Sequence, residues 1–127
     1  MRSAIALTAL LALTSGCALL VPAGAGYVVA TTTDDSTYIV QVKTGVEVTW
    51  ASTKTTLSHL SLKPVDTDDE RRSAIAEIDS SKVTVTVEAY DLDQSVIKVS
   101  ATKFALRDTA TANMVKDKIL SDLERKN

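Results

Sequence analysis

This chain of 127 residues has only one His and one Cys, and it has no excess of positive charge, since its formal net charge is −2. A zinc site needs three or four His, Cys or carboxylate ligands, so the composition argues against one. The charge balance also lacks the basic excess that neutralises nucleic-acid phosphates, which argues against a nucleic-acid partner. At this length we expect one folded domain at most.

Sequence motifs of catalysis are absent as well. We find no glycine-rich phosphate loop, nucleophile elbow or dinucleotide fingerprint in the sequence. The only histidine, His59, has no local nucleophile or orienting carboxylate, and helical spacing places it away from the apolar stripe of its segment. We therefore predict an exposed His59, no catalytic residues, no bound cofactor or metal, and a protein that is not an enzyme.

Charge is missing from the start of the chain, where every residue between Arg2 and Asp34 is uncharged. One positive residue, an apolar core over residues 4–13 and small residues after it form the pattern of a secretory signal peptide. The core is too short for a membrane-spanning helix, which takes roughly 20 apolar residues. We predict that residues 1–16 are a signal peptide.

Residues 13–17 (Leu-Thr-Ser-Gly-Cys) resemble a bacterial lipobox, with Leu13 one place earlier than in the commonest pattern. The resemblance implies cleavage before Cys17, diacylation of its sulfur and attachment to a membrane. Because Ala18 follows in place of Asp, it also implies the periplasmic face of the outer membrane. The alternative is an ordinary cleavage site that leaves a free thiol at Cys17.

Residues 17–36 are rich in Gly, Ala and Thr, which predicts a flexible tether, with a short strand over residues 27–30 as the alternative. The folded domain is then residues 37–127. Residues 38–43 (YIVQVK) are apolar and β-branched, which predicts its first strand. Thr44 and Glu47 have the spacing of a capping box.

A helix over residues 46–60 follows, because its larger side chains recur at helical spacing. The apolar stripe of this helix comprises Val46, Trp50, Thr53, Leu57 and Leu60. The remaining predicted elements are an edge strand over residues 60–65 with Pro64 near its end, a polar turn over 66–71, strands over 72–79, 82–90 and 95–103, and a helix over 108–125.

These elements predict an α+β fold with a mainly antiparallel sheet of about five strands, in the order β-α-β-β-β-β-α, and two helices packed on one face. The apolar alternation also predicts the strand register. A turn at residues 80–81 would place Ala76 opposite Val85, and the next hairpin would place Val85 opposite Ala101.

An acidic stretch follows the predicted edge strand. Asp66, Asp68, Glu70 and Glu77 have EF-hand-like spacing, but Arg71 occupies the place where the calcium loop needs glycine. We therefore favour a solvated turn over a calcium site. Saturating heat at one ion per chain in a calorimetric calcium titration would reverse this preference.

One face of the predicted sheet is left uncovered by helices and carries a partly apolar strip. Such strips often mark contacts with partners, although single exposed apolar residues are also normal. We predict that this face contacts a protein partner or a second copy of the chain. Its candidate residues are Ile75, Thr84, Thr86, Tyr90 and Val96.

Several segments together resemble a family of small bacterial lipoproteins of unknown function. They are the lipobox with Cys17, the Gly-Ala-Gly-Tyr-Val-Val run at residues 24–29, Trp50-Ala51, the Val-rich strand at 83–87 and the closing Ile119-Leu120 with Leu123. The resemblance implies an envelope location and an α+β domain, and it supplies no activity. We expect a membrane-anchored structural or interaction module. The alternative is a small apolar-ligand binder with a cavity between helices and sheet, around Trp50 and Leu57.

Overall fold

The computed structural model describes residues 28–34 and 37–126. The predicted signal peptide and the predicted lipidation site Cys17 lie outside these residues. The elements follow in the order β1 (Val28–Asp34), β2 (Thr37–Val42), α1 (Val46–Leu60), β3 (Asp66–Asp68), β4 (Ser73–Ile78), β5 (Ser81–Ala89), β6 (Ser95–Lys103), β7 (Leu106–Arg107) and α2 (Thr109–Lys126).

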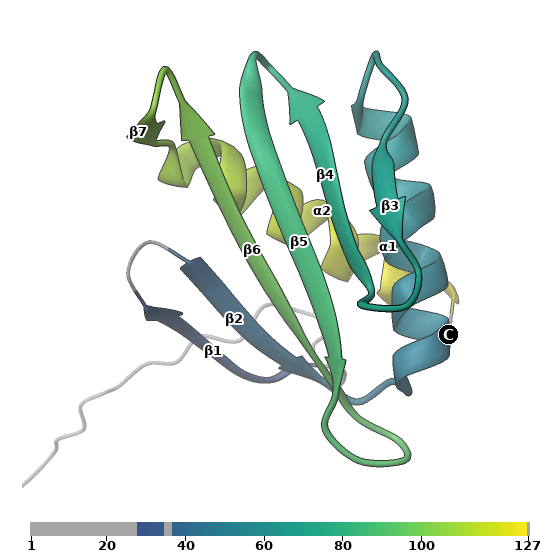
Figure 1. Cartoon of the computed structure of the whole chain (residues 1–127). Helices are drawn as coiled ribbons and strands as arrows, with labels where there is room; N and C mark the ends of the chain where they lie inside the picture. Colours follow the sequence, from purple (N-terminus) through teal and green to yellow (C-terminus); the bar gives the residue numbers. More distant parts are fainter. Residues whose placement is uncertain (1–27, 35–36, 127) are drawn as a thin grey trace, which may run out of the picture.

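The strands form one antiparallel sheet in the order β1-β2-β6-β5-β4-β3, and β7 pairs with β6. Both helices lie behind this sheet in Figure 1. Helix α2 contacts β6, β2 and β5, α1 contacts β5, β4 and β6, and the two helices contact each other. The predicted α+β class is confirmed. The sheet has more strands than the predicted five, because it also contains the short β7 and β1, where the sequence favoured a tether over a strand.

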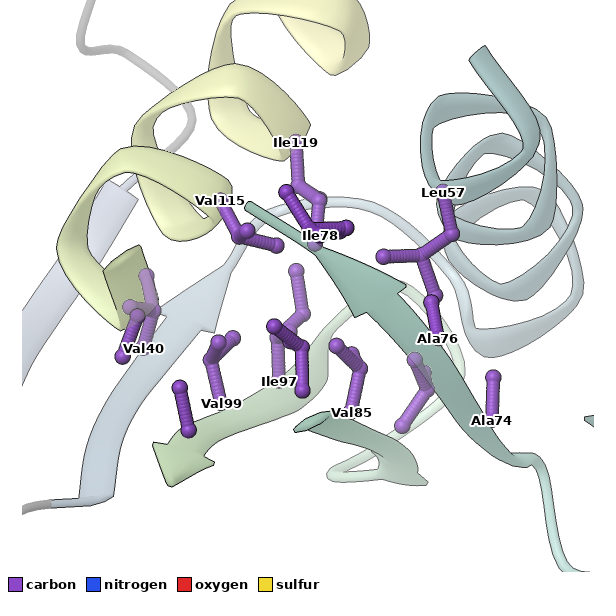
Figure 2. Close-up of a cluster of buried hydrophobic side chains, with 14 of the residues drawn as sticks. Val40, Leu57, Ala74, Ala76, Ile78, Val85, Ile97, Val99, Val115 and Ile119 are labelled. Carbon is purple, nitrogen blue, oxygen red and sulfur yellow. The ribbon is translucent and has the colours of Figure 1, made fainter. Parts of the chain in front are cut away.

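The core lies between the sheet and the two helices, because alternate residues of the central strands point to the same side. Val83, Val85 and Val87 of β5 are buried, whereas Thr84 and Thr86 between them face the other side. Figure 2 shows Val115 and Ile119 of α2 above these strands. Every core side chain among the described residues lies between Val40 and Leu123. The described residues therefore supply a core that joins the sheet to both helices.

Helix α1 has the predicted bounds, but the predicted capping box is wrong. The N-cap is Gly45, which has extended backbone and makes no side-chain cap hydrogen bond. The Glu47 carboxylate instead forms an ion pair with Arg72 at 2.8 Å. A capping box would need this carboxylate to accept the backbone amide of the cap residue. The carbonyl oxygen of Thr44 accepts hydrogen bonds from the hydroxyls of Ser95, at 2.8 Å, and Thr49, at 3.3 Å.

The predicted edge strand over residues 60–65 is also wrong. Helix α1 continues to Leu60, and the edge strand is β3, within the segment predicted as a polar turn. Pro64 has no amide for a strand ladder. The Ser61 hydroxyl lies 2.7 Å from the carbonyl oxygen of Lys63 and 3.2 Å from that of Glu77 in β4.

The predicted tether extends too far toward the domain. Residues 28–34 form β1, which pairs with β2 from Val28 opposite Val42 to Asp34 opposite Thr37. The alternative of a short strand over residues 27–30 was closer to this result. The segment is rich in β-branched Val and Thr, which suit a strand once a partner strand is present.

Both predicted hairpin registers are shifted by two residues. Ala76 lies opposite Val83 and Val85 opposite Val99, because the first turn is Asp79-Ser80. Both turn residues have positive φ, 53° and 67°, as in the two-residue turns that match the twist of a hairpin. A shift of two keeps every side chain on its predicted face, so the partition of the sheet into a buried and an open side is unaffected.

Candidate functional site: the helix-free sheet face

The sheet face that points away from both helices carries four of the five residues predicted to contact a partner. The fifth, Tyr90, follows the end of β5. This helix-free face is toward the viewer in Figure 1. Ile75 lies directly opposite Thr84 in the β4–β5 ladder. Thr84, Thr86 and Val96 are half-buried, Ile75 is 36% exposed, and Tyr90, just past the end of β5, is 60% exposed.

The structure does not gather these residues into one apolar patch. Val96 lies opposite Glu88 and Gln41, whereas Thr86 lies opposite Lys98. The Lys98 ammonium and the Glu88 carboxylate form an ion pair at 3.2 Å. This charged pair lies between Val96 and the Ile75–Thr84 pair, so the face is a mixed surface of hydroxyls, charges and single apolar residues.

A groove of about 510 Å³ opens at one end of this face, and sequence reasoning did not predict it. Its lining includes Ile75 of β4, Thr102 of β6, Pro64 and Phe104. Lys63 and Lys82 also line it. The sequence feature that could have indicated this groove is the apolar Phe104 beside Lys103, in a segment that had no role in the predicted core.

His59 is exposed, as predicted. It lines a small pocket of about 180 Å³ together with Ser52, Thr55, Thr56, Asp122 and Arg125. Asp122 accepts a hydrogen bond from the Thr56 hydroxyl at 2.6 Å and another from Arg125. Burial opposes its ionisation, but these bonds and the charge of Lys118 outweigh burial and lower the pKa of Asp122. Asp122 therefore joins α1 to α2 as an ionised acceptor, which does not suit a general base at neutral pH.

Asp69 joins the β3–β4 turn to α1, whereas Asp68 bonds within the turn. Asp69 accepts hydrogen bonds from Lys54 at 2.8 Å and from the Trp50 indole at 2.9 Å, and these contacts lower its pKa. Asp68 accepts the backbone amides of Glu70 and Arg71. Within residues 28–34 and 37–126, no group of three or more His, Cys, Asp or Glu side chains is placed to hold a metal ion.

Asp108 occupies the N-cap position of α2. Its carboxylate accepts the Thr111 amide at 3.1 Å, the Thr111 hydroxyl at 2.7 Å and the Ser81 hydroxyl. These bonds, led by the one from Ser81, lower the pKa of Asp108 to about 2. A cap of this kind satisfies backbone amides that have no partner inside the helix.

The depressed pKa of Asp108 predicts an acid-dependent loss of stability. The ionised carboxylate stabilises the fold fully above the unfolded-state pKa of 3.8, and this stabilisation is lost as the pH falls through about 2. Asp108→Asn keeps a capping oxygen but does not titrate. We expect its melting temperature to fall less steeply than that of the wild type as the pH is lowered from 3.8 toward 2, measured by circular dichroism. Parallel melting curves for the two proteins over this range would contradict the assignment.

The chain matches no protein-family model, no curated protein and no solved structure. Within the part of the chain that the structure describes, no helix is long and apolar enough to cross a membrane.

Proposed function

We propose that this chain is a lipid-anchored module of the bacterial cell envelope that binds a protein partner through its helix-free sheet face. The observation that carries the proposal is the placement of both helices on one side of the sheet (Figure 1). This arrangement leaves the other side, with Ile75, Tyr90 and the groove, open to a partner. The partner is another envelope protein or a second copy of the chain.

The proposed anchor is Cys17, at the periplasmic face of the outer membrane. The signal-like residues 1–16, the lipobox-like residues 13–17 and Ala18 support it, as does the resemblance to small bacterial lipoproteins of unknown function. Acyl chains bind bilayers with about 0.8 kcal/mol for each buried methylene. They would hold a domain at a membrane without a spanning helix.

The polar groups of the domain support binding over catalysis. The carboxylates with lowered pKa values, Asp69, Asp108 and Asp122, each accept several hydrogen bonds that join elements of the fold. A catalytic acid or base generally has a pKa moved toward the working pH. The shifts found in this domain are in the opposite direction.

The packing favours the interaction module over the apolar-ligand binder. Leu57 is fully buried, and Trp50 is 4% exposed with its indole bound to Asp69. Neither residue lines the groove on the helix-free face or the pocket beside His59. Neither lines the hollow at the β3–β4 turn, which is formed by residues 66–71, Ser73 and Ile75. A ligand cavity between the helices and the sheet would require space next to these two side chains.

The test of the interface is the double variant Ile75→Lys with Tyr90→Lys, with Val48→Lys as its control. Val48 is 49% exposed on α1, on the helical side of the domain. We expect the double variant to lose crosslinking to its partner in envelope membranes, or its own dimer in gel filtration, because two desolvated charges oppose association. The control should keep it. Unchanged association in the double variant would remove the helix-free face as the interface.

A further inference from the structure

The β6–β7 turn holds an aromatic residue in a backbone conformation that disfavours it. Phe104 and Ala105 have φ values of 53° and 65°, and the flanking Lys103 and Leu106 pair across the turn. Two-residue turns of this type strongly favour Asn-Gly, because a side chain at positive φ is strained. Phe104 is nevertheless 85% exposed, so burial in the core does not offset the strain. A bulky Phe at such a position indicates a role other than forming the turn.

Exposed apolar surface gathers around the groove that this turn lines. Phe104 both lines the groove and exposes most of its side chain to water. Ile75, 36% exposed, and Pro64 line the groove as well. Leu62, which is fully exposed, lies next to the groove residue Lys63 in the chain. Apolar surface that is gathered in this way often marks an interaction site.

The charges in and beside the groove are balanced. Lys63 forms an ion pair with Glu77 at 2.7 Å, and Glu77 lies directly opposite Lys82 in the β4–β5 ladder. Asp79 precedes the groove residue Ser80. Two lysines and two carboxylates therefore offer no excess charge that would attract a strongly charged partner. A surface with balanced charges can meet an identical surface without net like-charge repulsion, which is otherwise costly.

The same patch carries both halves of a self-complementary contact. A two-fold dimer needs a protruding side chain and the hollow that receives it on one surface. Phe104 is the protruding side chain, and the groove of about 510 Å³ has the volume of sites that hold small molecules. It can therefore receive one aromatic side chain. A two-fold rotation would place each Phe104 at the groove of the other copy.

The area of such a contact approaches that of a stable interface. Two Phe104 side chains would bury about 600–1,000 Å², at about 150–250 Å² for each ring and a similar area of the groove that covers it. Ile75 and Leu62 would bring this area toward the roughly 1,200 Å² of a specific interface. The exposed aromatic residue and the groove thus account for most of a dimer contact.

We propose that two copies of the chain associate through this groove, with Phe104 of each copy seated in the groove of the other. The proposal rests on the helix-free face being the interface, and it names a second copy as the partner and Phe104 as the central contact. Burial of Phe104 between the copies removes its apolar surface from water, which offsets the strain of the turn.

The first test uses the full-length chain in cells that express two differently tagged copies. With p-benzoylphenylalanine in place of Phe104, irradiation should link the two tags in one covalent dimer. Mass spectrometry should place the crosslink on residues 62–64 or 75–77 of the other copy. The control carries the same photoreactive residue in place of Leu92, which is 95% exposed in the β5–β6 hairpin at the other end of the sheet. It should give no such dimer.

The second test compares the dissociation constants of the purified full-length dimers by light scattering. The double variant Phe104→Asn with Ala105→Gly should raise this constant at least about tenfold, because it removes the aromatic side chain at the centre of the contact. At concentrations at which both proteins are monomeric, this variant should melt at a higher temperature than the wild type, because it relieves the turn. Leu92→Asn should leave the dissociation constant unchanged.

A wild type that remains monomeric, or a Phe104 variant that dimerises like the wild type, would overturn the proposal. Crosslinks from position 104 to a different protein alone would also overturn it, because the second copy would not be the occupant of the groove. The proposed function would survive that last result. It would fail separately if the double variant Ile75→Lys with Tyr90→Lys kept every contact of the wild type.

Discussion

Leu57→Ala is expected to lower the free energy of unfolding by about 2–5 kcal/mol. Leu57 is fully buried, and it extends from α1 toward Ala76 of β4 (Figure 2). The small Ala74 and Ala76 side chains beneath it cannot fill the space that a shortened residue would leave. The loss therefore includes both the transfer free energy of the removed atoms and the cost of a cavity. Urea denaturation followed by circular dichroism measures it.

Val48→Ala is the matched control on the same helix. Val48 is half-exposed on the side of α1 that faces solvent, so we expect a change within about 0.5 kcal/mol. If Leu57→Ala cost less than about 1 kcal/mol, the layer between α1 and the sheet would be loosely packed, below the range for buried leucines. That result would favour the apolar-ligand binder over the interaction module.

Cys17→Ser is expected to abolish lipid attachment completely, because Cys17 is the only thiol in the chain. Cells fed an alkyne fatty acid should label the wild type and leave the variant without label. The variant should also keep residues 1–16, because cleavage at a lipobox depends on the acylated cysteine in the family that the sequence resembles. Ser15→Ala, also within the lipobox, is the control and should be labelled like the wild type. If wild type and Cys17→Ser were labelled equally, the lipid would be attached to another residue. If neither were labelled, the protein would carry no lipid.

The faces of the sheet could be predicted from the sequence, but the register could not. Alternation of Val83, Val85 and Val87 with Thr84 and Thr86 has a period of two, so it assigns each side chain to a face. A slip of two residues leaves that pattern intact. Only the φ angles of the turn at residues 79–80 decide between such registers, and apolar periodicity does not encode them.

Long-range contacts explain the remaining errors in the fold. The spacing of Thr44 and Glu47 matched a capping box, but Arg72, distant in sequence, binds Glu47. Strand β1 has a polar run of threonines that resembles a tether until β2 pairs with it. Neither partner is visible in a local window of sequence.

The candidate site was predictable only in part, for the same reason. Alternation placed Ile75 and Thr84 on the helix-free face correctly. The Lys98–Glu88 ion pair that divides this face depends on the register, and the prominence of Phe104 depends on a turn conformation.

The most direct test of the account is the intact mass of the protein extracted from the membranes of cells that express it naturally. We expect a chain that begins at Cys17, with the added mass of acyl groups on that residue. A mass that includes residues 1–16, or one that corresponds to an unmodified Cys17, would contradict the lipid anchor and with it the proposed location and mode of action.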